Sequence, residues 1–152
     1  AKLFRTLTRD NMEQLHAILV KDLSVALGLR EKPVGVLGSR YRPLDNIHQI
    51  MEGVEELSRA VSRVDSPYAQ ALLALSGISY LQPFEDGNKR TARLMGNAIL
   101  LAHGCAPLSY RSVDEADYRA TTIVFYELNS LVPFKRIFIS QYDFAARNYA
   151  VK

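Results

Sequence analysis

The chain has few residues of the kinds that mark disulfide-rich, fibrous or membrane-spanning proteins. Its single cysteine, Cys105, excludes an internal disulfide and argues against a thiolate metal cage. Glycine and proline, with 8 and 6 residues, are too scarce for a linker-rich or collagen-like chain. No apolar run reaches the roughly 18 residues that a membrane-spanning helix needs, and no secretory signal is visible. We therefore expect a cytoplasmic protein without a membrane partner.

Charge of one sign is not concentrated anywhere in the chain. Lys and Arg number 19 and Asp and Glu 16, which gives a formal net charge of +3 at pH 7. The two signs alternate along most segments, as on solvated helix faces, so no nucleic-acid partner is expected. The hydrophobic content, 48% of 152 residues, suffices for one core and predicts a single domain over residues 1–152.

Apolar residues recur at steps of three and four along most of the chain, which predicts an all-α fold. The first helix should follow the polar cluster at residues 8–11 and end at Gly28. The helix after Ser66-Pro67 is apolar on all sides and should form the buried centre. Further helices are expected after Asp45, from about 87 to 104, from 112 to about 129, and from 133 onward.

Residues 31–44 differ because prolines and glycines interrupt them. Val34 and Val36 favour strands, residues 38–39 are a turn signal, and Pro33 and Pro43 bracket the run. We expect a short exposed β-hairpin here, with a plain connector as the alternative.

The most unusual stretch is the segment QPFEDGNKRTAR at residues 82–93. Pro83 should stop the preceding helix and Gly87 should open the next one. The first N–H groups of a helix lack partners inside the helix, and the helix dipole favours negative charge there. The first two turns also carry three cations, Lys89, Arg90 and Arg93. Together these features indicate an anion site, for which phosphate is the obvious ligand.

Two further side chains suit a bound phosphate. The carboxylate of Asp86 is of the kind that holds Mg²⁺ together with phosphate oxygens and water. The Asn88 amide can donate to a phosphate oxygen without adding charge. A merely charged surface helix is the alternative, and no P-loop pattern occurs that would decide between the two.

The same stretch resembles the signature of Fic-fold proteins, H-P-F-x-[DE]-G-N-[GK]-R-x-x-R. The matching residues are Pro83, Phe84, Asp86, Gly87, Asn88, Lys89, Arg90 and Arg93. The order of expected elements, a helix, a hairpin, two helices, the signature loop and further helices, is also similar over nearly the whole chain. The resemblance implies a Fic-type helical bundle with one small β-hairpin flap.

Fic enzymes typically transfer AMP from ATP to a hydroxyl group of a target protein in the presence of Mg²⁺. The resemblance therefore implies ATP as co-substrate, Mg²⁺ at Asp86, and Phe84 packed inward as the anchor of the loop. It assigns phosphate binding to Gly87, Asn88, Lys89, Arg90 and Arg93. It also makes the hairpin, with Gly35, Val36 and Leu37, the flap that holds the target protein by strand addition.

The first signature position departs from the family, because Gln82 stands where the family has a histidine that acts as general base. A carboxamide cannot accept the hydroxyl proton, and loss of such a base typically costs about 10² to 10⁴ in rate. Three explanations remain: an inactivated nucleotide-binding module, a base from another group, or slow transfer with Gln82 orienting the hydroxyl. Surface or packing roles are expected for the histidines His16, His48 and His103.

Two alternatives to an impaired AMP transferase stay open. One is a catalytically silent Fic-fold module that binds a protein through its flap. The other is a phosphotransferase similar to Doc, which shares the Asn-Lys-Arg run, although Gly87 and Arg93 favour the AMP-transferring branch. Many Fic proteins carry a restraining helix, [ST]-x-x-x-E-[GN], and residues 6–11 approach it only with Asp10 in place of Glu. An ordinary helix start explains them better, so any restraint would come from a separate inhibitory chain or segment.

Overall fold

The computed structural model describes residues 2–110 and 132–148, and these residues form helices and irregular segments without a strand. A short 3₁₀ turn, η1, precedes the α-helices. The elements are η1 (Lys2–Phe4), α1 (Arg9–Leu19), α2 (Ile47–Ser62), α3 (Pro67–Leu81), α4 (Asn88–Ala102) and α6 (Val132–Asn148). The all-α expectation is confirmed for this part, while the helix expected over 112–129 lies outside the described residues. None of the described helices combines the length and apolarity needed to cross a membrane.

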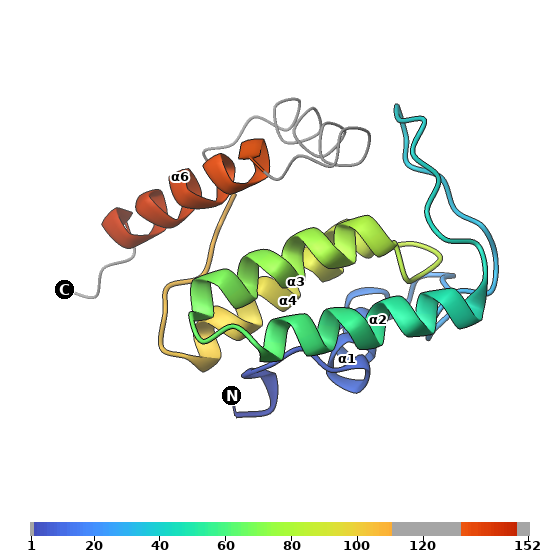
Figure 1. Cartoon of the computed structure of the whole chain (residues 1–152), viewed down its shortest axis with the longest axis horizontal. Coiled ribbons are helices and arrows are strands. Elements are labelled where there is room, and N and C mark those ends of the chain that lie inside the picture. Colours follow the sequence, from blue (N-terminus) through green and yellow to red (C-terminus); the bar gives the residue numbers. More distant parts are fainter. Residues whose placement is uncertain (1, 111–131, 149–152) are drawn as a thin grey trace.

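Helix α3 is the central element of the bundle, and it packs against both α2 and α4 (Figure 1). It begins where the sequence predicts, with the Ser66 hydroxyl accepting the Ala69 N–H and proline in the first turn. Its alanines and larger apolar residues are buried on several sides, as expected for a central helix. Helix α2 comes close to it because Leu57 packs on Gly77, where no side chain intervenes.

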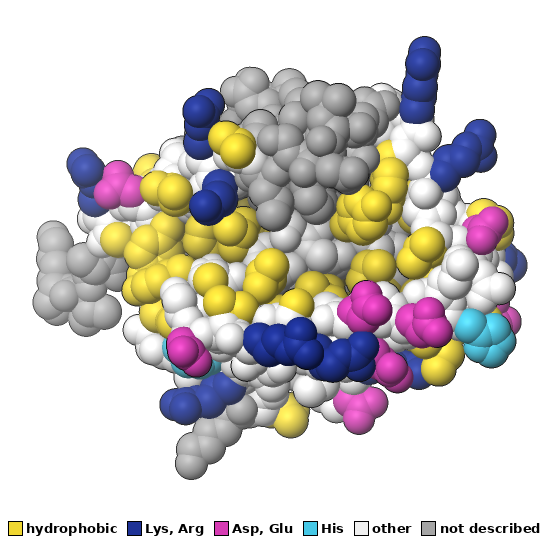
Figure 2. Space-filling model, viewed as in Figure 1, with side chains coloured by type: hydrophobic (Ala, Val, Ile, Leu, Met, Phe, Trp, Pro, Cys, Tyr) yellow, Lys and Arg dark blue, Asp and Glu magenta, His cyan; other side chains and the backbone are white. Residues whose placement is uncertain are grey.

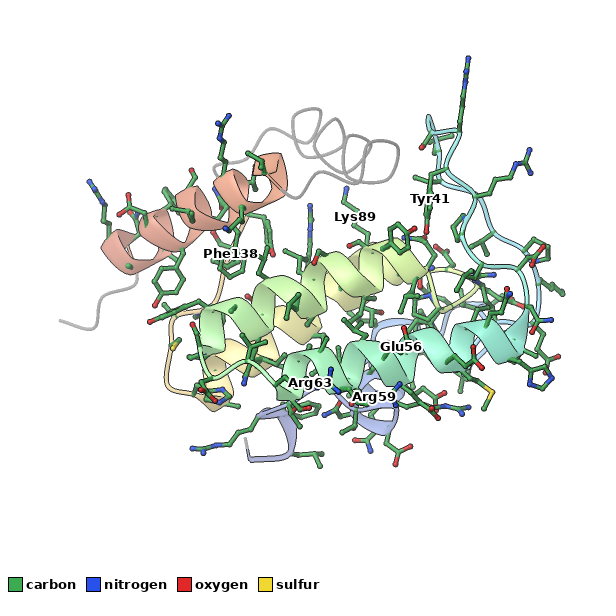
Figure 3. All side chains as sticks on the ribbon, viewed as in Figure 1. Tyr41, Glu56, Arg59, Arg63, Lys89 and Phe138 are labelled. Carbon is green, nitrogen blue, oxygen red and sulfur yellow. The ribbon has the colours of Figure 1, made fainter. Side chains whose placement is uncertain are left out.

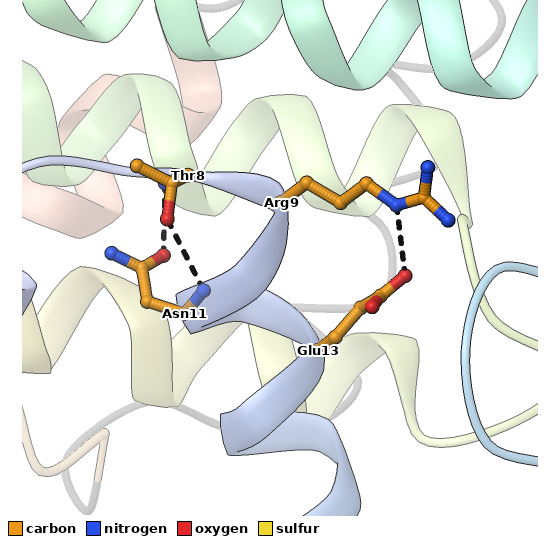
Figure 4. Close-up of polar contacts among 4 residues, drawn as sticks. All are labelled: Thr8, Arg9, Asn11 and Glu13. Atoms are coloured by element: carbon orange, nitrogen blue, oxygen red, sulfur yellow. Dashed lines mark hydrogen bonds and ion pairs between the residues drawn. The ribbon is translucent and has the colours of Figure 1, made fainter.

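Helix α1 starts as predicted but ends early. The Thr8 hydroxyl accepts the Asn11 N–H at 3.2 Å, and Asn11 Oδ1 accepts the Thr8 N–H at 2.8 Å (Figure 4). The expectation that the helix ends at Gly28 is wrong. The backbone leaves helical geometry after Leu19 and reaches a left-handed φ of 66° at Asp22. Leu23 is therefore not on the buried stripe, although its spacing continues the apolar pattern.

The expected β-hairpin at residues 33–44 does not form. The segment runs out from the bundle and returns (Figure 1, cyan), and it turns where the Ser39 N–H donates to the Val36 carbonyl at 3.1 Å. Gly38 permits this turn with a φ of 80°. The arms carry no strand ladder. Proline at both ends removes backbone donors, and the glycines lack side chains that would pair across the arms.

Helix α6 covers the beginning of α3 (Figure 1). Its anchor is Phe138, which the sequence predicts and which is buried against the core. Tyr142 meets Tyr68 of α3 edge to face, with ring centroids 4.7 Å apart and hydroxyl oxygens 3.1 Å apart. This hydrogen bond raises the pKa of the Tyr68 phenol.

Candidate functional site

The loop between α3 and α4 begins at Gln82, which ends α3 in left-handed geometry, with φ 48° and ψ 58°. That conformation costs a residue with a Cβ about 1–2 kcal/mol. The Gln82 N–H donates to the Ile78 carbonyl at 2.9 Å, and its side-chain Nε2 donates to the Ser79 carbonyl at 2.8 Å. The amide nitrogen of Gln82 is thus turned back onto α3.

Phe84 anchors the middle of the loop, as the resemblance implies. Its ring is fully buried and stacks on His16 of α1, with centroids 3.8 Å apart and planes 4° from parallel. His16 Nε2 donates to the Asp86 carbonyl at 2.9 Å, so the same imidazole holds two points of the loop. The sequence predicts a packing role for His16 but carries no signal that the packing partner is the signature loop.

Asn88 braces the loop from inside rather than presenting its amide to solvent. Its side chain is 5% exposed; Oδ1 accepts the Phe84 N–H at 2.9 Å, and Nδ2 donates to the Phe84 carbonyl at 2.8 Å. Buried backbone groups need such partners. One of the two Nδ2 hydrogens is thus used inside the loop, and donation from the Asn88 amide to phosphate stays a prediction. The backbone N–H of Asn88 lies at the first position of α4, and its binding to phosphate, which the resemblance implies, also stays a prediction.

Gly87 shapes the start of α4. Its φ is 81°, and a Cβ added there would lie 3.2 Å from Val20 Cγ1, so both backbone and space favour glycine. The Gly87 N–H donates to Asp86 Oδ1 at 2.7 Å and is occupied in this structure. The anion site predicted here therefore depends on the next N–H groups, at residues 88–90, which have no carbonyl within α4 to bind.

The three cations of this region have different surroundings. Lys89 and Arg90 are exposed in the first turn of α4, and Figure 3 shows Lys89 and Tyr41 above the same end of α3. Arg93 is half-buried, with its guanidinium carbon 4.7 Å from the centroid of the Tyr110 ring. Stacking on an aromatic face limits the motion of the guanidinium group. The helix start therefore combines backbone donors, two exposed cations and one held cation.

Asp86 is the one carboxylate that the sequence predicts as a metal ligand here. It is exposed, and one of its oxygens accepts the Gly87 N–H. Within residues 2–110 and 132–148, no cluster of three or more His, Cys, Asp or Glu could form a metal cage. This arrangement fits Mg²⁺ held by one carboxylate, with phosphate oxygens and water as the other ligands.

The flap segment is attached close to this loop. The Tyr41 hydroxyl donates to the Tyr80 carbonyl at 2.8 Å, and the two rings lie 4.9 Å apart. Tyr80 is in the last turn of α3, immediately before the loop. Of the predicted flap residues, Gly35 and Leu37 are exposed and Val36 is half-buried. The structure therefore brings the predicted flap to the α3 end of the signature loop.

A helical bundle with a loop of this sequence at a helix start defines a recognisable class of protein. The model of the Fic/DOC family matches residues 6–100, which is more than half of the chain. The chain therefore belongs to the Fic/DOC family, and the resemblance carried by residues 82–93 is confirmed.

Two curated relatives connect the chain to protein adenylyltransferases. Protein adenylyltransferase fic-1 of Caenorhabditis elegans is 25% identical over 143 residues, which cover 92% of this chain and 28% of the relative. Protein adenylyltransferase Fic of Nematostella vectensis is 46% identical over 52 residues, which cover 34% of this chain and 12% of the relative. The chain thus spans between 12% and 28% of the length of these two proteins.

Solved structures share the fold at low identity. Fic-1 from C. elegans superposes with a TM-score of 0.72 and 22% identity, covering 99% of this chain and 45% of that one. BepC from Bartonella tribocorum, solved with bound AMPPNP, gives 0.74 and 14%, covering 90% and 75%. A Fic family protein from Desulfovibrio desulfuricans gives 0.77 and 19%, covering 94% and 47%. These similarities establish a Fic-type helical fold.

Proposed function

We propose that this chain is a nucleotide-binding Fic domain that takes Mg·ATP at the start of α4, and that its transfer of AMP to a target hydroxyl is impaired at Gln82. The observation that carries the proposal is a signature loop braced for binding but with an amide at its first position. The adenylyltransferase names of its relatives and the AMPPNP bound to BepC support the choice of nucleotide.

In this proposal the triphosphate lies against the N–H groups at residues 88–90, where the helix dipole favours its charge. Lys89, Arg90 and Arg93 contact the phosphates, with Arg93 held in place by Tyr110. Asp86 would hold Mg²⁺, which when bound neutralises charge that develops on the phosphates.

The proton of the target hydroxyl is the weak point of the proposed reaction. The hydroxyl oxygen bonds to the α-phosphorus, pyrophosphate leaves, and the hydroxyl proton must go to a base. Gln82 Nε2 donates to the Ser79 carbonyl, and toward a substrate hydroxyl the carboxamide can offer only a hydrogen bond. An amide oxygen has no useful basicity, so transfer should be slow unless another group takes the proton.

The proposed target segment lies along the flap. Arg40 and Arg42 are the charged side chains between residues 33 and 44, and both are exposed. Figure 2 shows Lys and Arg side chains at the outer end of this segment on the face drawn. Complementary charge aids docking and orientation, so we propose a target segment that carries acidic residues near its modified hydroxyl.

Transfer of AMP from α-labelled ATP to proteins of a cell lysate tests the proposal, with the unsubstituted chain beside Gln82→His and the control Gln82→Ala. We expect Gln82→His to transfer about 10² to 10⁴ times faster than the other two, while calorimetry gives similar Mg·ATP affinities for all three.

Each other outcome points elsewhere. ATP binding without transfer by any variant favours the silent docking module. Label arriving from γ-labelled ATP instead favours phosphoryl transfer similar to that of Doc. Absence of Mg·ATP binding by calorimetry contradicts the proposed function itself.

A further inference from the structure

Arg30 lies in the connection between α1 and the flap, and its side chain is 1% exposed. A buried guanidinium group is unfavourable unless its donors are satisfied. Arg30 finds its acceptors on the backbone. Nε donates to the Gln82 carbonyl at 2.5 Å, Nη1 to the Lys32 carbonyl at 2.9 Å, and Nη2 to the carbonyls of Leu44 at 2.5 Å and Leu81 at 3.3 Å.

These four carbonyls belong to two places that the reaction needs. Leu81 and Gln82 end α3 and begin the signature loop, and the Arg30 N–H adds a hydrogen bond to the Pro83 carbonyl at 2.9 Å. Lys32 immediately precedes the flap segment and Leu44 is its last residue. One side chain therefore joins both ends of the flap to the residue at the family's catalytic position.

The charge of Arg30 suits this location. The carbonyls at the end of a helix carry partial negative charge and favour a cation. Burial lowers the pKa of Arg30, whereas the nearby Tyr41 and Asp45 act in the opposite direction. The planar guanidinium group has five N–H donors at fixed angles, so it can hold several carbonyls at once, which a lysine ammonium cannot do in the same geometry.

We propose that Arg30 is a positioning residue for the proposed transfer: it sets the flap, and with it the target segment, in register with residue 82. This inference rests on the proposed function, since it assumes that the flap receives the target. The carbonyls that Arg30 binds lie on residues 81–83 and on the flap ends, outside the phosphate-binding residues 86–93. Arg30 should therefore govern use of the protein target and leave nucleotide affinity unchanged.

The experiment measures AMP transfer in the Gln82→His background, with Arg30→Lys added. Because a small misplacement of reacting groups costs about 100-fold, we expect kcat/KM for the protein target to fall by about that factor. Mg·ATP affinity by calorimetry should stay within about twofold. The comparison variant is Tyr41→Phe, which removes the hydrogen bond from the flap to the Tyr80 carbonyl but none of the four Arg30 side-chain hydrogen bonds, and which should cost about 2- to 10-fold.

An unchanged kcat/KM in Arg30→Lys overturns the proposal, as does an equal loss of ATP affinity, which would indicate a general structural role. If Gln82→His shows no AMP transfer, that result contradicts the proposed function but not the role of Arg30. Hydrogen exchange then tests the role of Arg30 separately. Arg30→Lys should then speed exchange of the Gln82 N–H at least tenfold and leave amides of α2 unchanged. Equal rates at Gln82 in the two proteins would contradict the role of Arg30.

If circular dichroism shows that Arg30→Lys is unfolded, the test uses the unsubstituted chain instead. There the Arg30 Nε–H, read by nuclear magnetic resonance, should exchange at least 100 times more slowly than the Nε–H of the exposed Arg42. Equal rates for the two groups would show that Arg30 is not held on the Gln82 carbonyl in solution, which contradicts its positioning role.

Discussion

The signature loop at residues 82–87 and the flap at residues 33–44 lie side by side but are held differently. The loop is braced by His16 from α1 and by Asn88 from α4, and its own residue Phe84 is fully buried. The flap is fastened at its two ends by Arg30, while Leu37 at its turn is 85% exposed.

The difference follows from where backbone groups can find partners. A buried N–H or carbonyl must be paired by the protein, and each such pair in the loop also restricts its position. The outer flap can use water, and by our proposal a target segment, as its partner. Under the proposed function, a site built in this way would present a preformed surface to the nucleotide and an adaptable edge to the protein target.

The largest expected effect comes from removing a brace of the loop. Asn88→Ala leaves both backbone groups of Phe84 without their partner, so we expect a loss of about 2–4 kcal/mol in the free energy of unfolding and loss of nucleotide affinity. Denaturant unfolding and calorimetry measure the two quantities.

Asn97 offers a matched control for Asn88, because its amide makes the same pair of bonds to the backbone of Leu108, at 2.7 and 2.8 Å. Asn97→Ala should destabilise the fold but leave nucleotide affinity unchanged. Equal losses of affinity in the two variants would mean that the loop brace has no special role in binding.

Loss of a phosphate contact should come next. Arg93→Ala should weaken Mg·ATP binding by about 1.5–3 kcal/mol, or roughly 10- to 150-fold, because a charge-assisted contact is lost. Arg9→Ala is the control, since Arg9 forms an exposed ion pair with Glu13 at 3.0 Å on α1 (Figure 4). Unchanged affinity in Arg93→Ala, measured by calorimetry, would remove Arg93 from the site.

Two glycines with the same φ allow the cost of backbone strain to be separated from the cost of steric contact with a new Cβ. Gly87 and Gly28 both have a φ of 81°, but a Cβ meets Val20 only at Gly87 and nothing within 4 Å at Gly28. Gly28→Ala should cost about 1 kcal/mol in unfolding free energy, and Gly87→Ala about 1–3 kcal/mol. Equal costs in thermal or denaturant unfolding would show that Val20 yields without penalty.

The smallest effect on stability is expected at the flap. Leu37→Ser should change the free energy of unfolding by less than about 0.5 kcal/mol, because Leu37 is exposed. In the Gln82→His background it should nevertheless reduce modification of the protein target, measured as kcat/KM with ATP saturating. An unchanged kcat/KM would indicate that the target does not use the outer flap.

Much of the helical framework could be predicted because its signals are local. Ser66 and Pro67 mark the start of α3, and apolar residues on all its sides predict its burial. The end of α1 could not be placed, because Leu23 continues the apolar spacing after the backbone has left helical geometry. The predicted β-hairpin was wrong because the strand preference of the valines does not outweigh the neighbouring prolines. The structure shows no strand in either arm of the segment.

The candidate site divides in the same way. Pattern alone placed Asp86, Gly87 and the cations at a helix start, and the family match agrees with that pattern. The inward amide of Asn88 and the imidazole of His16 on the loop could not be predicted. Both side chains form hydrogen bonds with backbone groups of the loop, at Phe84 and Asp86, and these groups come within reach only in the folded chain. Arg30 belongs to no sequence motif, and its contact with the signature loop and the flap is seen only from its hydrogen bonds to backbone carbonyls.

The amino-acid sequence by itself determined which family this chain belongs to, where its central helices start, and that glutamine is the first residue of the signature loop, since these depend on residue type and local spacing. The tertiary structure alone decided how Arg30, His16 and Asn88 are used. Their donors and acceptors are matched to backbone groups distant in the chain or turned inward by packing, and such matching exists only once the helices have come together.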